Sequence, residues 1–298
     1  MLHITGGGIM KRKVLLVLAC LLLIMALPTF AFADSGPKPS VRIEFTHLPD
    51  EPFYGTLLSE RDSTGPASAW DGKEPYPDYR GNAGGEEIWK VFLSYEDTDG
   101  YYFLQEWWDC SDDGELNWTY YPPSPFKILL YFPESDTFCV SPIYEKYAFD
   151  SYYKVNLKGW EDGTIEATTN YHYAREIFSL IARIIVTILI ELGIALLIGY
   201  REKKLFTFIA VVNIITQVIL NVSLNVINFN FGPRAFLIVY VLLEIVVLLV
   251  EVGLYSLLLQ KFSDKPQSRK KASGYAIAAN IVSFIAGIWL AVLIPGMF

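Results

Sequence analysis

The last third of the sequence contains four long apolar runs. They cover residues 177–199, 205–227, 235–259 and 275–295. Each run is long enough to cross about 30 Å of hydrocarbon as an α-helix. We therefore expect a membrane protein in which residues 175–298 form an all-α bundle of four transmembrane helices.

The N-terminus has the pattern of a secretory signal peptide. A basic cluster at 11–13 precedes an apolar stretch at 14–25, and a small-x-small cleavage site follows at 31–33. A further membrane span is the alternative, but this apolar stretch is short. Met10 fits as the true start, so residues 1–33 are interpreted as a start-site overcall plus a cleaved signal peptide.

The distribution of Lys and Arg predicts how the chain crosses the membrane. The connector 200–204 carries three Lys or Arg and the connector 260–274 carries five, whereas the loop 228–234 carries one. Positively charged loops stay in the cytoplasm. The expected location is the bacterial plasma membrane, with residues 34–174 and the C-terminus extracellular and the two basic connectors cytoplasmic.

The exported part, residues 34–174, is strongly acidic. It contains 26 Asp or Glu against 10 Lys or Arg, a balance of −16, while the whole chain carries −8. Phosphate binding needs the opposite sign, so nucleic acid is not expected as a partner. About 140 residues are enough for one domain with its own core.

The patterning of residues 34–174 favours β-structure, with many aromatic residues punctuated by Pro and Gly. A segment with apolar residues at helical spacing, 86–95, predicts one helix. The Asp-Gly turn at 112–115 indicates a hairpin between 101–108 and 116–121. Further strands are expected at 41–47, 126–132, 138–143 and 152–157. We expect an N-terminal, β-rich, sandwich-like α+β extracellular domain of transthyretin or immunoglobulin type.

Cys110 and Cys139 are the cysteines that remain once the signal peptide is removed. Outside the membrane they can oxidise, so a disulfide between them is one hypothesis. Two buried thiols are the other. The same part of the chain contains Trp89, Trp107, Trp108 and Trp118. Tryptophans of this kind form either a stacking platform for a sugar or, more commonly, part of an aromatic core.

Several short motifs resemble active sites without completing them. Residues 97–100 resemble part of a calcium loop, but the later ligands are missing, which favours a plain turn. Residues 124–127 match Ser-x-x-Lys, yet they open a predicted strand rather than a helix. His47 and His172 are the only histidines of the mature chain. This excludes a multi-histidine zinc site, and we predict neither a metal nor a cofactor.

Three glutamates lie inside the apolar runs, where carboxylates are costly and usually face a protein interior or a wet cavity. Helical spacing places them and several amides on one face of each helix. Counted from the cytoplasmic ends, Glu191, Asn213 and Glu251 lie about 12 Å deep at 1.5 Å per residue. The residues expected to form an intramembrane polar cluster, with Gln217 and Glu244 in a second layer nearer the middle of the bundle, are Glu191, Asn213, Gln217, Glu244, Glu251 and Asn280.

This cluster has a structural and a functional interpretation. Protonated glutamates that bond to amides fix the register between helices. Alternatively, the oxygens bind a proton, a metal cation or a small cationic substrate, which would make the protein a small transporter or an ion-coupled component. An intramembrane enzyme with Glu191 and Glu251 as paired acids has the least support, because perturbed acids alone are only candidates.

The leading functional hypothesis is a binding or scaffolding protein, in which the extracellular domain engages a ligand or partner and the helices anchor it. Neither a nucleotide-binding loop nor a credible nucleophile–base pair is recognisable, so the expectation leans away from an enzyme. The expected partners are membrane lipid and either another membrane protein or a second copy of the chain. The sequence does not identify the extracellular ligand.

Three strings carry a resemblance to known proteins. They are residues 59–66 (SERDSTGP), 213–217 (NIITQ) and 279–284 (ANIVSF). The chain resembles a group of exported multi-pass membrane proteins of Clostridia-type bacteria from the signal peptide onward. The resemblance implies membrane class and compartment, and it brings no activity, cofactor or catalytic residue with it.

Overall fold

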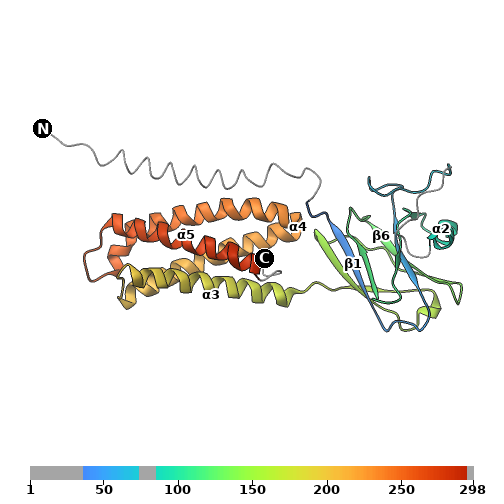
Figure 1. Ribbon diagram of the computed structural model, residues 1–298, viewed down its shortest axis with the longest axis horizontal. Helices are drawn as coiled ribbons and strands as arrows, with labels where there is room; N and C mark the ends of the chain where they lie inside the picture. Colours follow the sequence, from blue (N-terminus) through green and yellow to red (C-terminus); the bar gives the residue numbers. More distant parts are fainter. Residues whose placement is uncertain (1–35, 74–84, 294–298) are drawn as a thin grey trace. The chain divides into compact units, whose positions relative to one another are not determined.

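The computed structural model of the protein describes residues 36–73 and 85–293 (Figure 1). A β-rich region is followed by long apolar helices, as expected. The predicted signal peptide at 1–33 lies outside the described residues.

The first sheet has four strands in the order β5-β1-β8-β9. Its strands are β1 (Ser40–Thr46), β5 (Glu115–Trp118), β8 (Asp150–Asn156) and β9 (Ala167–Thr169). β1 and β8 are parallel along their full length, with Ser40 opposite Asp150. The other two pairings are antiparallel.

The second sheet is antiparallel and has β6 at its centre, between β2 and β7. The short strands β3 and β4 pair with opposite ends of β2. Its strands are β2 (Tyr54–Ser59), β3 (Tyr102–Phe103), β4 (Trp108–Asp109), β6 (Phe126–Phe132) and β7 (Thr137–Val140).

β6 lies between two apolar clusters, and all seven of its residues are buried. On one face, Ile128, Leu130 and Phe132 join a core that includes residues of the first sheet. On the other face, Leu129 and Tyr131 pack against helix α2 (Gly85–Ser94). Because side chains alternate along a strand, one strand serves both layers. The result is two packed sheets with one covering helix.

The predicted hairpin between 101–108 and 116–121 is wrong. β3 and β4 pair with β2, whereas β5 pairs with β1 in the other sheet. Gln105 has a φ of 66°, which interrupts the first segment. The Asp-Gly turn is present, but Gly114 accepts a hydrogen bond from the backbone N–H of Phe45 and so directs the chain from one sheet to the other.

The disulfide considered for Cys110 and Cys139 is not formed, since both cysteines are free and buried. Strand β6 separates them. Cys139 lies opposite Leu130 on one side of β6, while the Cys110 sulfur lies beside Gly55 on the other side. Two strand spacings amount to about 9–10 Å, which exceeds the Cα separation that a disulfide spans.

Both thiols are expected to resist alkylation in the native protein. Burial raises the pKa of Cys139 to about 11 and also raises the pKa of Cys110, so little reactive thiolate forms at neutral pH. Mass spectrometry should find both unlabelled after native iodoacetamide treatment and both labelled after denaturation without reductant. A mass two units lower that is restored by reduction would contradict these free thiols.

Three helices in the described part of the chain are long and apolar enough to cross a membrane. They begin with α3 (Tyr173–Leu197), continue with α4 (Lys203–Leu258) and end with α5 (Arg269–Leu293). The prediction of four helices is therefore wrong in its count. α4 has 56 residues and includes both predicted runs 205–227 and 235–259.

α4 is broken at Gly232, whose φ of 79° and ψ of −177° are not helical. Pro233 follows, and proline disfavours helical backbone at the residue before it. We call residues 203–231 the first arm of α4 and residues 233–258 the second arm. A hydrogen bond from Thr216 to Glu251 shows that the arms fold back on each other.

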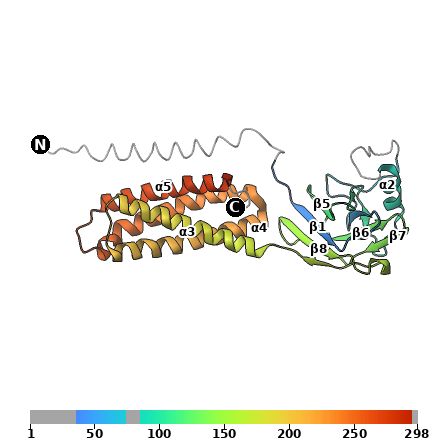
Figure 2. The same ribbon diagram turned by 60° about the horizontal axis from the view of Figure 1, so that its bottom comes forward.

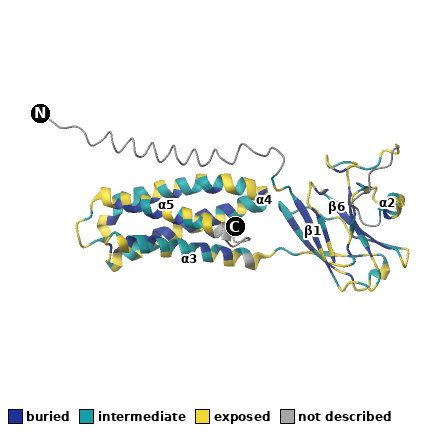
Figure 3. Cartoon of the chain, in the orientation of Figure 1, coloured by how far each residue is buried: buried dark blue, intermediate teal, exposed yellow. Residues whose placement is uncertain are grey.

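α3, the two arms of α4 and α5 pack side by side (Figure 2). Their polar residues are largely buried, whereas large aliphatic residues are exposed on the outside (Figure 3). Such a surface is compatible with insertion into a membrane. Exposed examples are Ile181, Leu189, Ile219, Leu237, Leu249 and Ile285.

Candidate functional site

A layer of buried polar side chains joins the helices, and we call it the acid layer. It consists of Glu191 from α3, Asn213 and Thr216 from the first arm of α4, Glu251 from the second arm and Asn280 from α5. Glu191 and Glu251 are only 1% and 0% exposed. Four helical segments thus contribute to one polar layer.

Asn213 connects three of these segments through its amide nitrogen. Its Nδ2 donates to Glu191 Oε2 at 2.7 Å and lies 3.0 Å from the hydroxyl of Tyr255. The connector between α3 and α4 is short, which makes them antiparallel neighbours and brings Glu191 close to Asn213. The Tyr275 hydroxyl, from α5, donates to the backbone carbonyl of Glu191.

Glu251 accepts a hydrogen bond on each carboxylate oxygen. Thr216 Oγ1 donates to Oε1 at 2.8 Å, and Asn280 Nδ2 donates to Oε2 at 2.8 Å. Both donors also lie within hydrogen-bond distance of a carbonyl in their own helix, Val212 for Thr216 and Ala276 for Asn280. The carboxylate therefore ties the second arm of α4 to the first arm and to α5.

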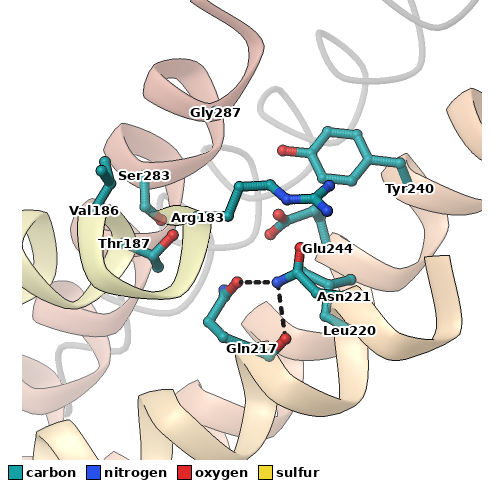
Figure 4. A pocket seen from close by; sticks show the side chains of 10 residues that line it. All are labelled: Arg183, Val186, Thr187, Gln217, Leu220, Asn221, Tyr240, Glu244, Ser283 and Gly287. Atoms are coloured by element: carbon teal, nitrogen blue, oxygen red, sulfur yellow. Dashed lines mark hydrogen bonds between the residues drawn. The ribbon is translucent and has the colours of Figure 1, made fainter. Parts of the chain in front are cut away.

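Gln217 and Glu244 lie outside the acid layer, where they line a separate small cavity of about 30 Å³ (Figure 4). This volume is room for one or two water molecules. The Asn221 amide donates to the side chain and the backbone carbonyl of Gln217. The residues that line the cavity are Arg183, Val186, Thr187, Gln217, Leu220, Asn221, Tyr240, Glu244, Ser283 and Gly287.

Arg183 points into this cavity beside Glu244 and the ring of Tyr240 (Figure 4). It is 7% exposed, and its Nη2 donates to Asn225 Oδ1 at 3.3 Å. Gly287 leaves room for the Tyr240 hydroxyl, because a Cβ there would lie 2.8 Å from that oxygen. The cavity is lined by several polar side chains and has only about 30 Å³, which suits bound water rather than a substrate.

The six residues of the predicted cluster thus separate into two groups. Glu191, Asn213, Glu251 and Asn280 lie in the acid layer, while Gln217 and Glu244 line the cavity. The predicted cluster did not include Thr216, a member of the acid layer, or Tyr275, which donates to the backbone carbonyl of Glu191 next to it. Thr216 lies three residues after Asn213 and so shares its helix face, a signal that could have identified it.

Across residues 36–73 and 85–293, no three or more His, Cys, Asp or Glu side chains lie close enough together to bind a metal ion.

In the β-rich region, the aspartates of the segment 97–100, which resembles a calcium loop, form ion pairs with Lys127 of β6. Lys127 Nζ lies 2.8 Å from Asp97 Oδ1 and 2.5 Å from Asp99 Oδ2. Asp97 also accepts the backbone N–H groups of Asp99 and Tyr101, which closes a turn. Burial alone would lower the pKa of Lys127, but hydrogen bonds and charge from both aspartates raise it.

The β-rich region also contains a surface pocket of about 180 Å³. Two loops form it, each next to a strand of the second sheet, β2 or β6. Ser124, the serine of the Ser-x-x-Lys string, lies here, and its hydroxyl accepts the backbone N–H of Lys146. The residues that line the pocket are Ser59, Glu60, Arg61, Ser63, Thr64, Tyr121, Pro122, Pro123, Ser124 and Pro125.

No protein-family model, curated protein or solved structure matches this chain.

Proposed function

We propose that this chain is a membrane-anchored binding protein, in which the β-rich domain engages a ligand or partner and the helices hold it in the bilayer. The proposal rests on a comparison of the volumes of two cavities. The pocket of the β-rich domain has about 180 Å³, whereas the cavity between the helices has about 30 Å³. Of these two, only the pocket of the β-rich domain has a volume large enough for a six-membered organic ring.

The acid layer supports the same division of roles. The Glu251 oxygens accept hydrogen bonds from the first arm of α4 and from α5, and Asn213 donates to Glu191. Polar side chains that bond across helices in a membrane select one packing arrangement. We infer that the acid layer fixes the register of the helices and that recognition is left to the β-rich domain.

We further propose a multi-pass topology in the bacterial plasma membrane. The basic connectors 200–204 and 260–274 would then be cytoplasmic, and the β-rich domain and the C-terminus extracellular. In this topology the two arms of α4 are separate crossings, since 56 residues of straight helix would measure about 84 Å. The resemblance to exported Clostridia-type membrane proteins agrees with this placement.

Partner capture tests this proposal. Cells that express the full chain are treated with an extracellular, membrane-impermeant cross-linker, and the chain is purified in a mild detergent. We expect a stoichiometric partner, an oligomer of the chain or a retained ligand. A monodisperse monomer with no cross-linked species that also binds none of the ligands added in titration would contradict the proposal.

A second candidate, an ion-coupled role, is favoured by one observation. Asn213 Oδ1 is buried with no hydrogen-bond partner among the described residues, although its own amide nitrogen bonds to Glu191. Amide and carboxylate oxygens together are hard ligands for a cation.

The variant Glu251→Gln separates the two candidates. In proteoliposomes, cation or proton flux that is present in the wild type and lost in this variant would favour the ion-coupled role. We expect no such flux in either protein, because the acid layer is interpreted as structural. Arg201→Gln, a change outside the acid layer, is the matched control.

A further inference from the structure

We propose that the 180 Å³ pocket on the β-rich domain is a binding site for one ring of a neutral carbohydrate. This inference rests on the proposed binding function and names its ligand class. The pocket is built by residues 59–64 and 121–125, two segments far apart in the sequence. Its volume is close to that of an engineered cavity of about 150 Å³ that holds benzene, so one six-membered ring fits.

The pocket presents an apolar surface on one side. Tyr121 is 41% exposed and Pro125 is half-buried, whereas Pro122 and Pro123 line the pocket from buried positions. Tyr120 lies next to Tyr121, with the two tyrosine rings edge to face at 5.2 Å. A tyrosine combines an apolar ring with a polar hydroxyl, which suits the C–H face and the hydroxyl rim of a sugar.

The backbone of these two tyrosines is held in place by the fold. The indole N–H of the buried Trp118 donates to the Tyr120 carbonyl at 3.1 Å. Tyr121 itself has a φ of 50°, a left-handed conformation that is uncommon for a bulky side chain. These contacts order the backbone that carries the two tyrosines, which lowers the entropic cost of binding.

The other loop that lines the pocket supplies hydrogen-bond donors and acceptors. Glu60 offers a carboxylate and Arg61 a guanidinium, and neither forms an ion pair with another described residue. Ser63 and Thr64 also line the pocket, but their hydroxyls are engaged within the loop: that of Ser63 donates to the Ala67 carbonyl and accepts the Gly65 N–H, and that of Thr64 lies 3.5 Å from the Ala67 carbonyl. Sugar hydroxyls both donate and accept, so they match a mixed lining of this type.

The charges around the pocket favour a neutral ligand over an anionic one. Glu60 and Arg61 cancel each other, the ammonium of Lys38 lies 5.7 and 5.6 Å from the ring centroids of Tyr120 and Tyr121, and the whole segment 34–174 carries −16. A polyanion would meet an unfavourable field. The four tryptophans suggested as a sugar platform do not line this pocket. Trp89, Trp107 and Trp118 are at most 3% exposed, and Trp108 is half-buried against the core. Exposed tyrosines take that role instead.

The test is direct binding of defined oligosaccharides to the full chain. The protein is purified in a detergent without a sugar head group, because a maltoside would compete for the pocket. Chitotetraose, cellotetraose and maltotetraose are titrated by calorimetry and by saturation-transfer NMR. A pocket for one ring predicts saturable binding of at least one of them, with a Kd of about 1 mM.

Variants then locate the site. Tyr121→Ala should weaken binding at least about tenfold, while Tyr121→Phe, which keeps the ring, should retain most of it. Tyr173→Ala removes another exposed tyrosine, one that lies outside the pocket, and should change nothing. Equal thermal midpoints would show that the variants are folded.

Two results would overturn the carbohydrate assignment. One is no saturable binding of any of the three sugars up to about 20 mM, and the other is binding that survives Tyr121→Ala. Partner capture repeated with Tyr121→Ala distinguishes this failure from failure of the proposed function. Suppose that no sugar binds and that a protein partner captured with the wild type is lost in Tyr121→Ala. This result would contradict the carbohydrate assignment but support the proposed binding function.

Discussion

Lys127→Met is expected to destabilise the β-rich domain by about 3–5 kcal/mol, the usual cost of removing one partner from a buried ion pair. The side chains of Lys127 and Asp97 are 5% and 1% exposed. Methionine fills a similar volume but offers no charge. The Asp97 carboxylate would then be buried without its cation. The free-energy cost of removing it from water would no longer be offset by the ion pair.

The controls follow from the geometry of the same cluster. Asp99 is 58% exposed, so Asp99→Asn should cost at most about 1 kcal/mol. The double variant Lys127→Met with Asp97→Asn should recover much of the loss, because no buried charge remains. Chemical unfolding followed by tryptophan fluorescence measures all three. A loss below about 1 kcal/mol for Lys127→Met would show that Asp97 is not sealed from water.

The same ion pair gives a pH dependence with a defined sign. The pKa of Lys127 is raised in the folded protein above its ordinary 10.5, because hydrogen bonds and charge from both aspartates outweigh burial. A raised folded-state pKa contributes stability that is complete below the unfolded-state pKa. That contribution is lost as the pH rises through the folded-state pKa, so Lys127→Met should remove this part of the alkaline destabilisation.

The second large effect is expected at the acid layer, where Glu251→Ala should cost about 2–4 kcal/mol. The variant leaves a cavity at a residue with 0% exposure, and truncation of a buried side chain costs this much through lost packing. It also removes two hydrogen bonds across helices, each worth about 0.6 kcal/mol in a membrane.

Glu251→Gln is the matched control, expected to cost less than about 1 kcal/mol. The amide oxygen can accept from Asn280, and the amide nitrogen can donate to the Thr216 hydroxyl. That hydroxyl already lies 3.1 Å from the Val212 carbonyl and can donate there instead. Unfolding in SDS–detergent mixtures compares the variants. Equal losses for Ala and Gln would mean that the carboxylate charge itself is required.

Local patterns in the sequence predicted much of the fold. The alternation in 41–47 and the aromatic run 126–132 correspond to β1 and β6, and the helical spacing in 86–95 corresponds to α2. The pairing of strands was not predictable in the same way. The Asp-Gly turn resembles a hairpin turn locally, but the hydrogen bond from Phe45 to Gly114, almost 70 residues apart, decides the connection.

The helices show the same limit. A loop was predicted at 228–234 between two apolar runs, yet the helix continues to Phe231 and the interruption is confined to Gly232. The short connector predicted that Glu191 and Asn213 are neighbours. Nothing local indicated that Tyr275 reaches the Glu191 carbonyl from α5, because that contact depends on how the helices are rotated. The 180 Å³ pocket of the β-rich region was missed because two loops far apart in the sequence create it.

The account depends most on the convergence of acids and amides from separate helices into one hydrogen-bonded layer. A double-mutant cycle between Glu251 and Asn280 measures this contact, using both alanine variants and their combination in SDS unfolding. We predict a coupling free energy of about 0.5–1.7 kcal/mol, the range of hydrogen bonds between membrane helices. Losses that simply add, with a coupling indistinguishable from zero, would contradict the account.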